Sequence, residues 1–153
     1  MKAPKKSAAR PLNPEQQVRR LIARFKPKQQ TLVRSVRSGL RKRFPTADEL
    51  VYDYTKSLVI GYSPTERGSD AVVALAAGAD GVRLVFNQGP TLPDPNNILL
   101  GSGRATRFIW VDSPGTLKRP EVEAMMNAAA GAVKIPLRAS GSGKVVVKGK
   151  GGK

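Results

Sequence analysis

Histidine and cysteine are both absent from this chain of 153 residues. Their absence excludes Ser-His-Asp and Cys-His triads, zinc sites built from imidazole or thiolate, iron–sulfur clusters and disulfides. Only carboxylate, hydroxyl or lysine chemistry is left, and the acidic residues are too dispersed for paired acid–base work or chelation. We therefore expect a protein without enzymatic activity, metal or cofactor. An enzymatic alternative would need Lys56 or a tyrosine as its acting group.

Acidic residues are scarce as well: 11 Asp and Glu stand against 27 Lys and Arg, which gives a formal net charge of +16. Residues 1–44 hold fourteen basic residues and one acid, residues 45–137 hold eight basic and ten acidic residues, and residues 138–153 hold five basic residues and no acid. Basic segments attract polyanions by releasing counterions, so nucleic acid or another polyanion is a candidate partner. Lysine-rich ends that only keep the protein soluble are the alternative.

Long apolar runs are also missing. No run of eighteen apolar residues is present, and the basic start has no apolar segment of the kind that a secretory signal needs. We expect a cytoplasmic protein without a membrane partner. Residues 1–14 and 138–153 are rich in Lys, Pro, Gly and Ser, which predicts disordered basic arms around one folded domain over residues 15–137. Val145, Val146 and Val147 would form a short strand only if another strand accepted them.

Apolar residues recur at helical spacing in the first part of the domain. Val18, Leu21, Ile22 and Phe25 share one face, which predicts a helix between Pro14 and Pro27. The same period predicts a second helix from about Lys28 to Phe44, and a third helix begins near Pro120 and ends at Gly131.

From Leu50 onward the apolar period changes to two, which is typical of half-buried strands. Strands are predicted over residues 57–63, 71–77, 82–87 and 107–111, and the Gly-Ala-Asp-Gly turn at 78–81 joins two of them in an antiparallel hairpin. The fold class is therefore α+β: an antiparallel sheet of four to six strands packed against two N-terminal helices and one C-terminal helix. An open sheet face would allow two subunits to pair, which leaves a homodimer open.

Two sets of polar side chains are candidate sites. The first set lies in strand or loop positions and would line a small-ligand pocket if the sheet curves around it: Tyr52, Tyr54, Lys56, Tyr62, Arg67, Asn87, Arg104 and Arg107. The second set would contact a polyanion and combines a stripe on the second helix with C-terminal lysines: Arg34, Arg37, Arg41, Lys144, Lys148 and Lys150.

Three motifs occur in order in the middle of the chain: GYSPTER at 61–67, LPDP at 92–95 and GSGR at 101–104. Together with the surrounding sequence over about residues 15–132 they resemble the YdhG-like family, a bacterial domain family of unknown function. The resemblance implies an α+β fold of antiparallel strands with flanking helices, and no established reaction. Some relatives are labelled frataxin-like iron chaperones, a role that relies on an acidic surface, whereas this chain is strongly basic.

Two functional hypotheses follow. In the first, the folded domain is a non-enzymatic binding module for a small ligand or protein partner, and the arms add affinity for polyanions. In the second, the protein is a nucleic-acid-binding accessory protein whose helical arginines join the arms in one basic surface. The second hypothesis requires Arg34, Arg37 and Arg41 to lie on the same side of the domain as the arms.

Overall fold

The structure of the protein, a computed structural model, describes residues 12–88, 91–102 and 106–150. Its helices are α2 (Pro14–Ile22), α3 (Pro27–Arg43) and α4 (Pro120–Ala132), with short 3-10 helices η1 (Gly68–Asp70) and η3 (Pro114–Lys118). Its strands are β1 (Asp48–Asp53), β2 (Leu58–Ser63), β3 (Val73–Gly78), β4 (Gly81–Phe86), β5 (Arg107–Val111) and β6 (Val145–Lys150). The α+β prediction is confirmed. No helix of the described ranges is long and apolar enough to cross a membrane.

Each of the three α-helices begins at a proline. Pro14, Pro27 and Pro120 stand at the start of their helices, where the missing N–H has no intrahelical partner to lose. A capping box also fixes the start of α2, because the Asn13 side chain accepts the N–H of Gln16 and the Gln16 side chain accepts the N–H of Asn13. The first helix ends at Ile22, before Phe25 and earlier than predicted, and Pro27 begins α3.

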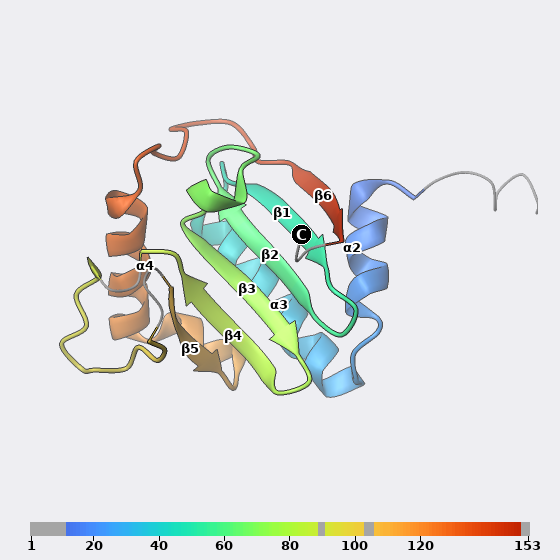
Figure 1. Ribbon diagram of the computed structural model, residues 1–153, viewed down its shortest axis with the longest axis horizontal. Coiled ribbons are helices and arrows are strands. Elements are labelled where there is room, and N and C mark those ends of the chain that lie inside the picture. Colours follow the sequence, from blue (N-terminus) through green and yellow to red (C-terminus); the bar gives the residue numbers. More distant parts are fainter. Residues whose placement is uncertain (1–11, 89–90, 103–105, 151–153) are drawn as a thin grey trace, which may run out of the picture.

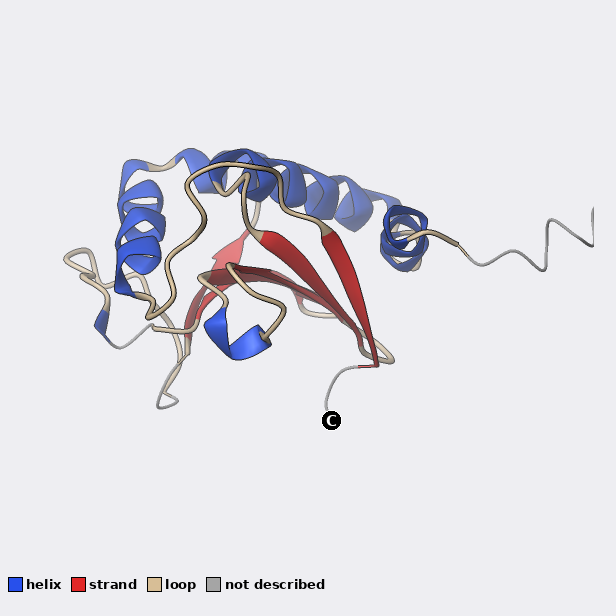
Figure 2. Ribbon diagram, turned by 90° about the horizontal axis from the view of Figure 1, so that it is seen from above, coloured by secondary structure: helices blue, strands red, loops and turns tan. Residues whose placement is uncertain are grey.

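The six strands form one sheet in the order β5-β4-β3-β2-β1-β6 (Figure 1). Consecutive strands from β1 to β5 pair antiparallel, and the hairpin predicted around the Gly-Ala-Asp-Gly turn is formed by β3 and β4. The sheet is mixed, however, because β6 pairs parallel with β1. Helix α3 runs across one face of the sheet with α2 and α4 at its sides (Figure 2).

The hydrophobic core lies between the helices and this face of the sheet. Alternate residues of the central strands supply one side of it: Leu58, Ile60, Leu75, Leu84 and Phe86. The helices supply the other side: Val18, Ile22, Val33, Val36, Leu40, Val122 and Met126. These side chains are all buried, and each contributes roughly 1.5–3 kcal/mol through the removal of apolar surface from water.

The opposite face of the sheet is covered only in part. The segment around η1 lies over β1 and β2, since a Cβ added to Gly61 would lie 3.5 Å from the Ala71 Cβ and one added to Gly68 would overlap the Tyr52 hydroxyl. Toward β4 and β5 the same face carries Trp110, of which 44% is exposed. The sheet therefore has one dry face under the helices and one face that is open at its β5 side.

The C-terminal segment differs from the prediction. Residues 138–153 were expected to be a disordered tail, which is wrong for Val145–Lys150, because this segment forms β6. The physical reason is that β1 offers an unpaired edge, and three consecutive valines are strong strand formers once such an edge accepts them. The N-terminal arm expected over residues 1–14 lies outside the described residues up to residue 11, and its last part caps and starts α2.

Hydrogen bonds hold the approach to β6 in place. The Arg138 guanidinium donates to the carbonyl of Thr46 at 2.7 Å, and the Thr46 hydroxyl donates to the carbonyl of Arg138 at 2.7 Å. The buried carboxylate of Asp48 accepts the N–H of Lys144 at 3.1 Å, and Gly143 donates its N–H to the carbonyl of Pro45 at 2.9 Å. The segment before β6 thus passes close to the N-terminal end of β1, and β6 then pairs with β1.

The variant Gly143→Ala should displace β6, because a Cβ at this position would overlap the carbonyl oxygen of Ala47. We expect the free energy of unfolding to fall by about 1–3 kcal/mol, the usual cost of overpacking. Urea unfolding followed by circular dichroism measures this loss, and faster hydrogen exchange in β1 would locate it.

Gly131→Ala is the matched control. A Cβ on Gly131 has no neighbour within 4 Å, and the residue lies within α4. This change should stabilise the protein by roughly 0.5–1 kcal/mol, because alanine favours a helix more than glycine does. Equal stability of both variants would show that β6 does not depend on the close approach at Gly143.

Candidate functional site

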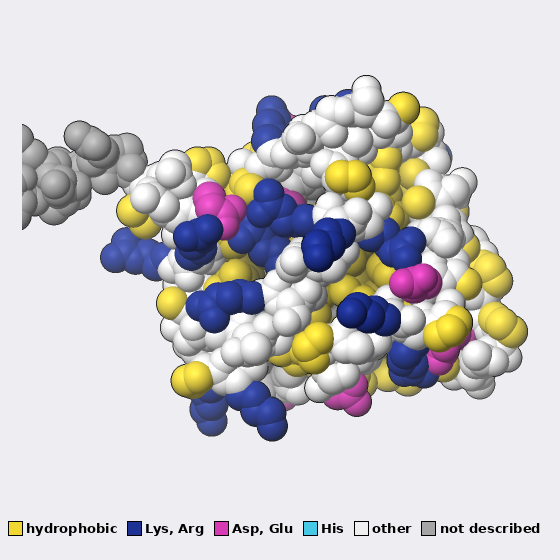
Figure 3. Space-filling view, turned by 180° about the vertical axis from the view of Figure 1, so that it is seen from behind, with side chains coloured by type: hydrophobic (Ala, Val, Ile, Leu, Met, Phe, Trp, Pro, Cys, Tyr) yellow, Lys and Arg dark blue, Asp and Glu magenta, His cyan; other side chains and the backbone are white. Residues whose placement is uncertain are grey.

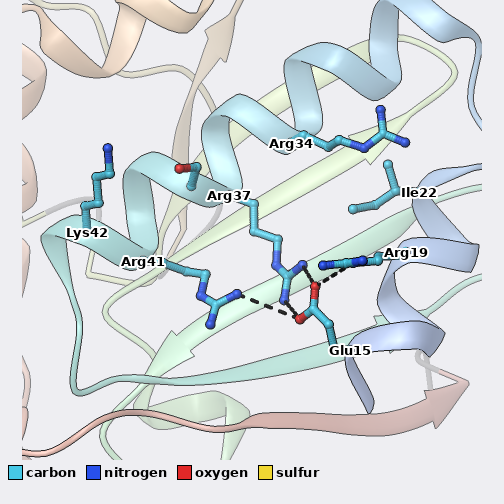
Figure 4. Close-up of a pocket in the computed structure, with 8 residues that line it drawn as sticks. Glu15, Arg19, Ile22, Arg34, Arg37, Arg41 and Lys42 are labelled. Carbon is cyan, nitrogen blue, oxygen red and sulfur yellow. Dashed lines mark hydrogen bonds and ion pairs between the residues drawn. The ribbon is translucent and has the colours of Figure 1, made fainter. Parts of the chain in front are cut away.

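A groove of about 630 Å³ separates α2 from α3 on the helical side of the molecule (Figure 4). We call it the α2–α3 groove. It is lined by Glu15, Arg19, Ile22, Arg34, Arg37, Ser38, Arg41 and Lys42. Basic side chains dominate this lining, and Glu15 is its one acid.

Arg37 lies at the floor of the α2–α3 groove between two carboxylates. Its guanidinium donates from Nε and Nη2 to Glu49, at 3.0 and 2.9 Å, and from Nη1 and Nη2 to Glu15, at 3.0 and 2.7 Å. Tyr62 donates its hydroxyl hydrogen to Glu49 at 2.6 Å. Arg37, Glu49 and Tyr62 are buried, so this network of charge-assisted hydrogen bonds satisfies groups that burial would otherwise destabilise.

The network shifts the proton affinities of its members. The hydrogen bond from Arg37 lowers the pKa of Glu15 from 4.5 to about 2. Burial by itself lowers the pKa of Arg37, but its hydrogen bonds to Glu15 and Glu49 outweigh burial and raise the pKa above its ordinary value. Burial, followed by the nearby Glu49 carboxylate, raises the pKa of the Tyr62 hydroxyl well above 10. Tyr62 therefore stays neutral and acts as a hydrogen-bond donor to Glu49.

The prediction that Arg37 contacts a polyanion from an exposed stripe is wrong. Only 7% of Arg37 is exposed, and both of its sides are paired with carboxylates. The helical period places Arg37 on the edge of the apolar face of α3, where Glu49 of β1 lies opposite. Its role is structural: it joins α3 to α2 and to the sheet.

Exposed cations surround this buried arginine. Arg34 is exposed and donates to the Gln30 side chain at 2.9 Å, one turn before it on α3. The Arg41 side chain is 50% exposed and lies 3.6 Å from Glu49 and 3.8 Å from Glu15. Lys42 is exposed and has no hydrogen bond or ion pair within the described ranges. These three residues keep positive charge available at the surface.

A second groove, of about 820 Å³, lies on the other side of α3 against η3 and α4. Arg34, Ser38 and Lys42 line both grooves, and Lys118 joins them in the second. Figure 3 shows Lys and Arg side chains gathered over this side of the molecule, with fewer acidic side chains between them. We call the exposed cations along the two grooves the basic helix surface: Arg19, Arg34, Arg41, Lys42 and Lys118.

The residues predicted to line a ligand pocket do not come together. Tyr62 is fully buried on the helical side of the sheet, whereas Tyr52 pairs with Val59 on the opposite face. Arg67 and Asn87 lie near Tyr52 around η1, where Asn87 donates to the carbonyls of Gly68 and Ala71. The expectation of one pocket built by all three tyrosines is therefore wrong.

The remaining predicted residues are spread over the rest of the domain. Tyr54 and Lys56 lie in the turn between β1 and β2, and Arg107 begins β5 on the helical side, opposite Phe86. Arg104 lies outside the described residues.

Two of the C-terminal lysines predicted to bind a polyanion contact the same loop residue. Lys144 forms an ion pair with Glu66 at 2.7 Å, and Lys148 donates to the carbonyl of Glu66 at 2.9 Å. Lys150 ends β6. Lys144 and Lys148 therefore do not belong to the basic helix surface.

Sequence reasoning missed several residues of the grooves and of the buried network, although signals for three of them were present. Glu15 and Arg19 are one helical turn apart and pair at 3.1 Å, as the i, i+4 spacing predicts. Glu49 shares the strand face of Val51, and an acid on a core-facing strand position needs a buried partner. Lys118 gave no signal, because its place beside α3 depends on the path of η3.

The described residues contain no group of three or more acidic side chains arranged to hold a metal ion. Glu15, the one acid that lines the α2–α3 groove, is paired with Arg37, as is Glu49 behind it. The groove therefore presents exposed cationic side chains around an acid that is already paired.

Comparison with known proteins adds no relative: no family model, curated protein or solved structure matches this chain. The resemblance to the YdhG-like family stays a prediction. Two of its motifs order loops in this structure. In GYSPTER the Thr65 hydroxyl donates to Asp70 at 2.7 Å, and in LPDP the Asp94 carboxylate accepts the N–H groups of Ile98 and Leu99 at 2.9 Å.

The lowered pKa of Glu15 predicts a pH dependence of stability. Because the folded state holds this carboxylate ionised, it stabilises the protein above pH 4.5, and this contribution is lost as the pH falls from 4.5 toward about 2. Glu15→Gln should therefore flatten the decline of the free energy of unfolding over this range. Urea unfolding at a series of pH values tests this, and an identical decline in both proteins would contradict it.

Replacing Arg37 by an apolar side chain should lower the free energy of unfolding more than replacing an exposed arginine does. In Arg37→Met the buried Glu49 carboxylate loses its two closest charged donors, and we expect a loss of about 3–5 kcal/mol in the free energy of unfolding. The double variant Arg37→Met/Glu49→Gln should recover much of this loss, because a neutral amide still accepts the hydrogen bond of Tyr62. Equal losses in the single and double variants would contradict the buried-charge explanation.

Proposed function

We propose that this protein is a non-enzymatic nucleic-acid-binding accessory module, which contacts phosphates through the basic helix surface. The observation that carries this proposal is the set of exposed cations in two adjoining grooves along α3. The nearby acids are fewer than these cations and already paired: Glu15 is shared by Arg37, Arg19 and Arg41, and Glu123 pairs with Arg43 at 3.2 Å. The surface therefore keeps a net positive charge for an external anion.

The spacing of the cations suits a phosphate backbone. Arg34, Ser38 and Lys42 follow at four-residue intervals on one line of α3, so they span about 12 Å along the helix axis. Phosphates of one DNA strand rise by about 3.4 Å each along a duplex. The line of donors therefore reaches several consecutive phosphates, and Arg19 and Lys118 widen it on both sides.

The N-terminal segment adds positive charge next to the basic helix surface. The chain enters α2 at Asn13, two residues before Glu15 of the α2–α3 groove, and four basic residues precede it. These residues are Lys2, Lys5, Lys6 and Arg10. A basic arm attached at the rim of the groove adds counterion release to the contacts of the folded part.

The alternative function, a pocket for a small ligand or protein partner formed by the tyrosines, has less support. Its candidate residues lie on both faces of the sheet and in the β1–β2 turn. The α2–α3 groove is lined mainly by basic side chains and is open to solvent. Such a groove suits a charged polymer better than a small molecule that must be enclosed.

Neutralising two shared groove residues tests the proposal. The double variant Arg34→Gln/Lys42→Gln should weaken binding to a labelled DNA duplex. It should also lower the slope of log affinity against log salt by about 0.9 for each phosphate that the protein no longer neutralises. Fluorescence anisotropy at several salt concentrations measures both quantities. The unfolding midpoint should change little, because both side chains are exposed.

Lys56→Gln is the control, since Lys56 is exposed in the β1–β2 turn and lines neither groove. It should change the affinity less than the double variant does for each charge removed. An equal loss per charge in both proteins would mean that affinity follows net charge alone, and the basic helix surface would then not be a site.

A further inference from the structure

The open face of the sheet carries an exposed aromatic cluster that the basic helix surface does not include. Phe108 and Trp110 of β5 meet edge to face, with ring centroids 5.6 Å apart and planes at 83°. Trp110 is 44% exposed and Phe108 is partly exposed. Large aromatic side chains left at the surface in contact with each other are a mark of recognition rather than of folding.

An arginine completes the cluster. Arg83 of β4 lies opposite Trp110 in the sheet, with its guanidinium carbon 5.1 Å from the Phe108 ring centroid and 6.0 Å from that of Trp110. These are cation–π distances. Arg83 is exposed and has neither a hydrogen bond nor an ion pair within the described part of the chain, so its N–H donors are available.

The strand register places smaller side chains beside the long side chains of Arg83 and Trp110. Arg83 pairs with Ala76 of β3, and Ala76 pairs with Val59 of β2. Because the neighbouring side chains are smaller, a hollow of about 230 Å³ lies next to Arg83 and Trp110. Asp80 is the acidic residue in its lining. This volume is below the range of about 300–1,000 Å³ that holds drug-sized ligands, and it suits a single flat ring system.

We propose that this face binds unpaired bases of a single-stranded nucleic acid, with one base stacked on Trp110 and Arg83 donating to the adjoining phosphate or base edge. The inference deepens the proposed function and rests on it. Stacking on aromatic rings beside cations is how single-strand binders hold bases without sequence preference. An exposed arginine at the centre of the cluster, with no ion pair within the described residues, favours this occupant over an apolar peptide.

The path around the sheet edge carries charges of both signs. Trp110 also lines a groove of about 740 Å³ between β5 and the start of α3, together with Lys26, Lys28, Asp80 and Asp112. Both lysines are exposed. A strand stacked on Trp110 can therefore continue past these lysines toward the helical side of the domain.

The experiment uses the intrinsic fluorescence of the full chain, in which Trp110 is the only tryptophan. A short oligothymidylate should quench Trp110 emission on binding, because stacking brings a base onto the indole. A hairpin duplex of equal charge should bind with little quenching. Anisotropy of the same two nucleic acids, labelled, gives the affinities.

Variants separate stacking from charge. Trp110→Ala should weaken oligothymidylate binding roughly five-fold or more and leave duplex binding nearly unchanged, since stacking on one aromatic ring is lost. Trp110→Phe should retain most of the affinity. Ile135→Ala is the matched control, because Ile135 is 42% exposed and lies after α4.

Each outcome decides between the two sites. If the oligothymidylate binds without quenching and Trp110→Ala binds it as tightly as the wild type, the stacking site is refuted while the basic helix surface stands. If Arg34→Gln/Lys42→Gln leaves duplex binding intact but Trp110→Ala weakens the single strand, the proposed helical site fails and the sheet site stands. Emission that changes with protein concentration alone, with dimers in sedimentation, would assign the cluster to a second copy of the chain.

Discussion

The buried pairing of Arg37 with Glu49 is the interaction on which the helical side of this domain depends. It joins α3 to β1, and its extension to Glu15 and Tyr62 adds α2 and β2. A carboxylate on the core face of a strand is costly to bury, and a paired guanidinium with a tyrosine hydroxyl offsets that cost. The network therefore positions α2 against α3, and the groove between them follows from it.

The same network explains why the neighbouring cations remain available. Arg37 occupies the nearby carboxylates of Glu15 and Glu49, and Arg34 and Lys42 form no ion pair with any residue that the structure describes. A buried arginine thus maintains a positive surface without contributing its own charge to a ligand. The division of roles follows from helix geometry, because residues three or four positions apart on α3 point either into the interface or along its border.

The two faces of the sheet serve different purposes because strands alternate their side chains. Val82, Leu84 and Ile109 enter the core, while Arg83 and Trp110 on the same strands point the other way. One strand pair therefore supplies both core packing and an exposed aromatic cluster. At the far edge, β6 pairs with β1 and becomes the outer strand of the sheet in its place.

The sequence by itself determined the α+β class, the helices that start at Pro14, Pro27 and Pro120, and the β3–β4 hairpin, because periodicity, capping and turn residues act over a few neighbouring positions. The sequence did not show that Arg37 is buried whereas Arg34 is exposed. It also did not show that Val145–Lys150 forms a strand. Both outcomes depend on β1: its Glu49 captures one arginine, and its open edge accepts the valines. Only the tertiary structure decides them, because partners distant in the chain set burial and pairing.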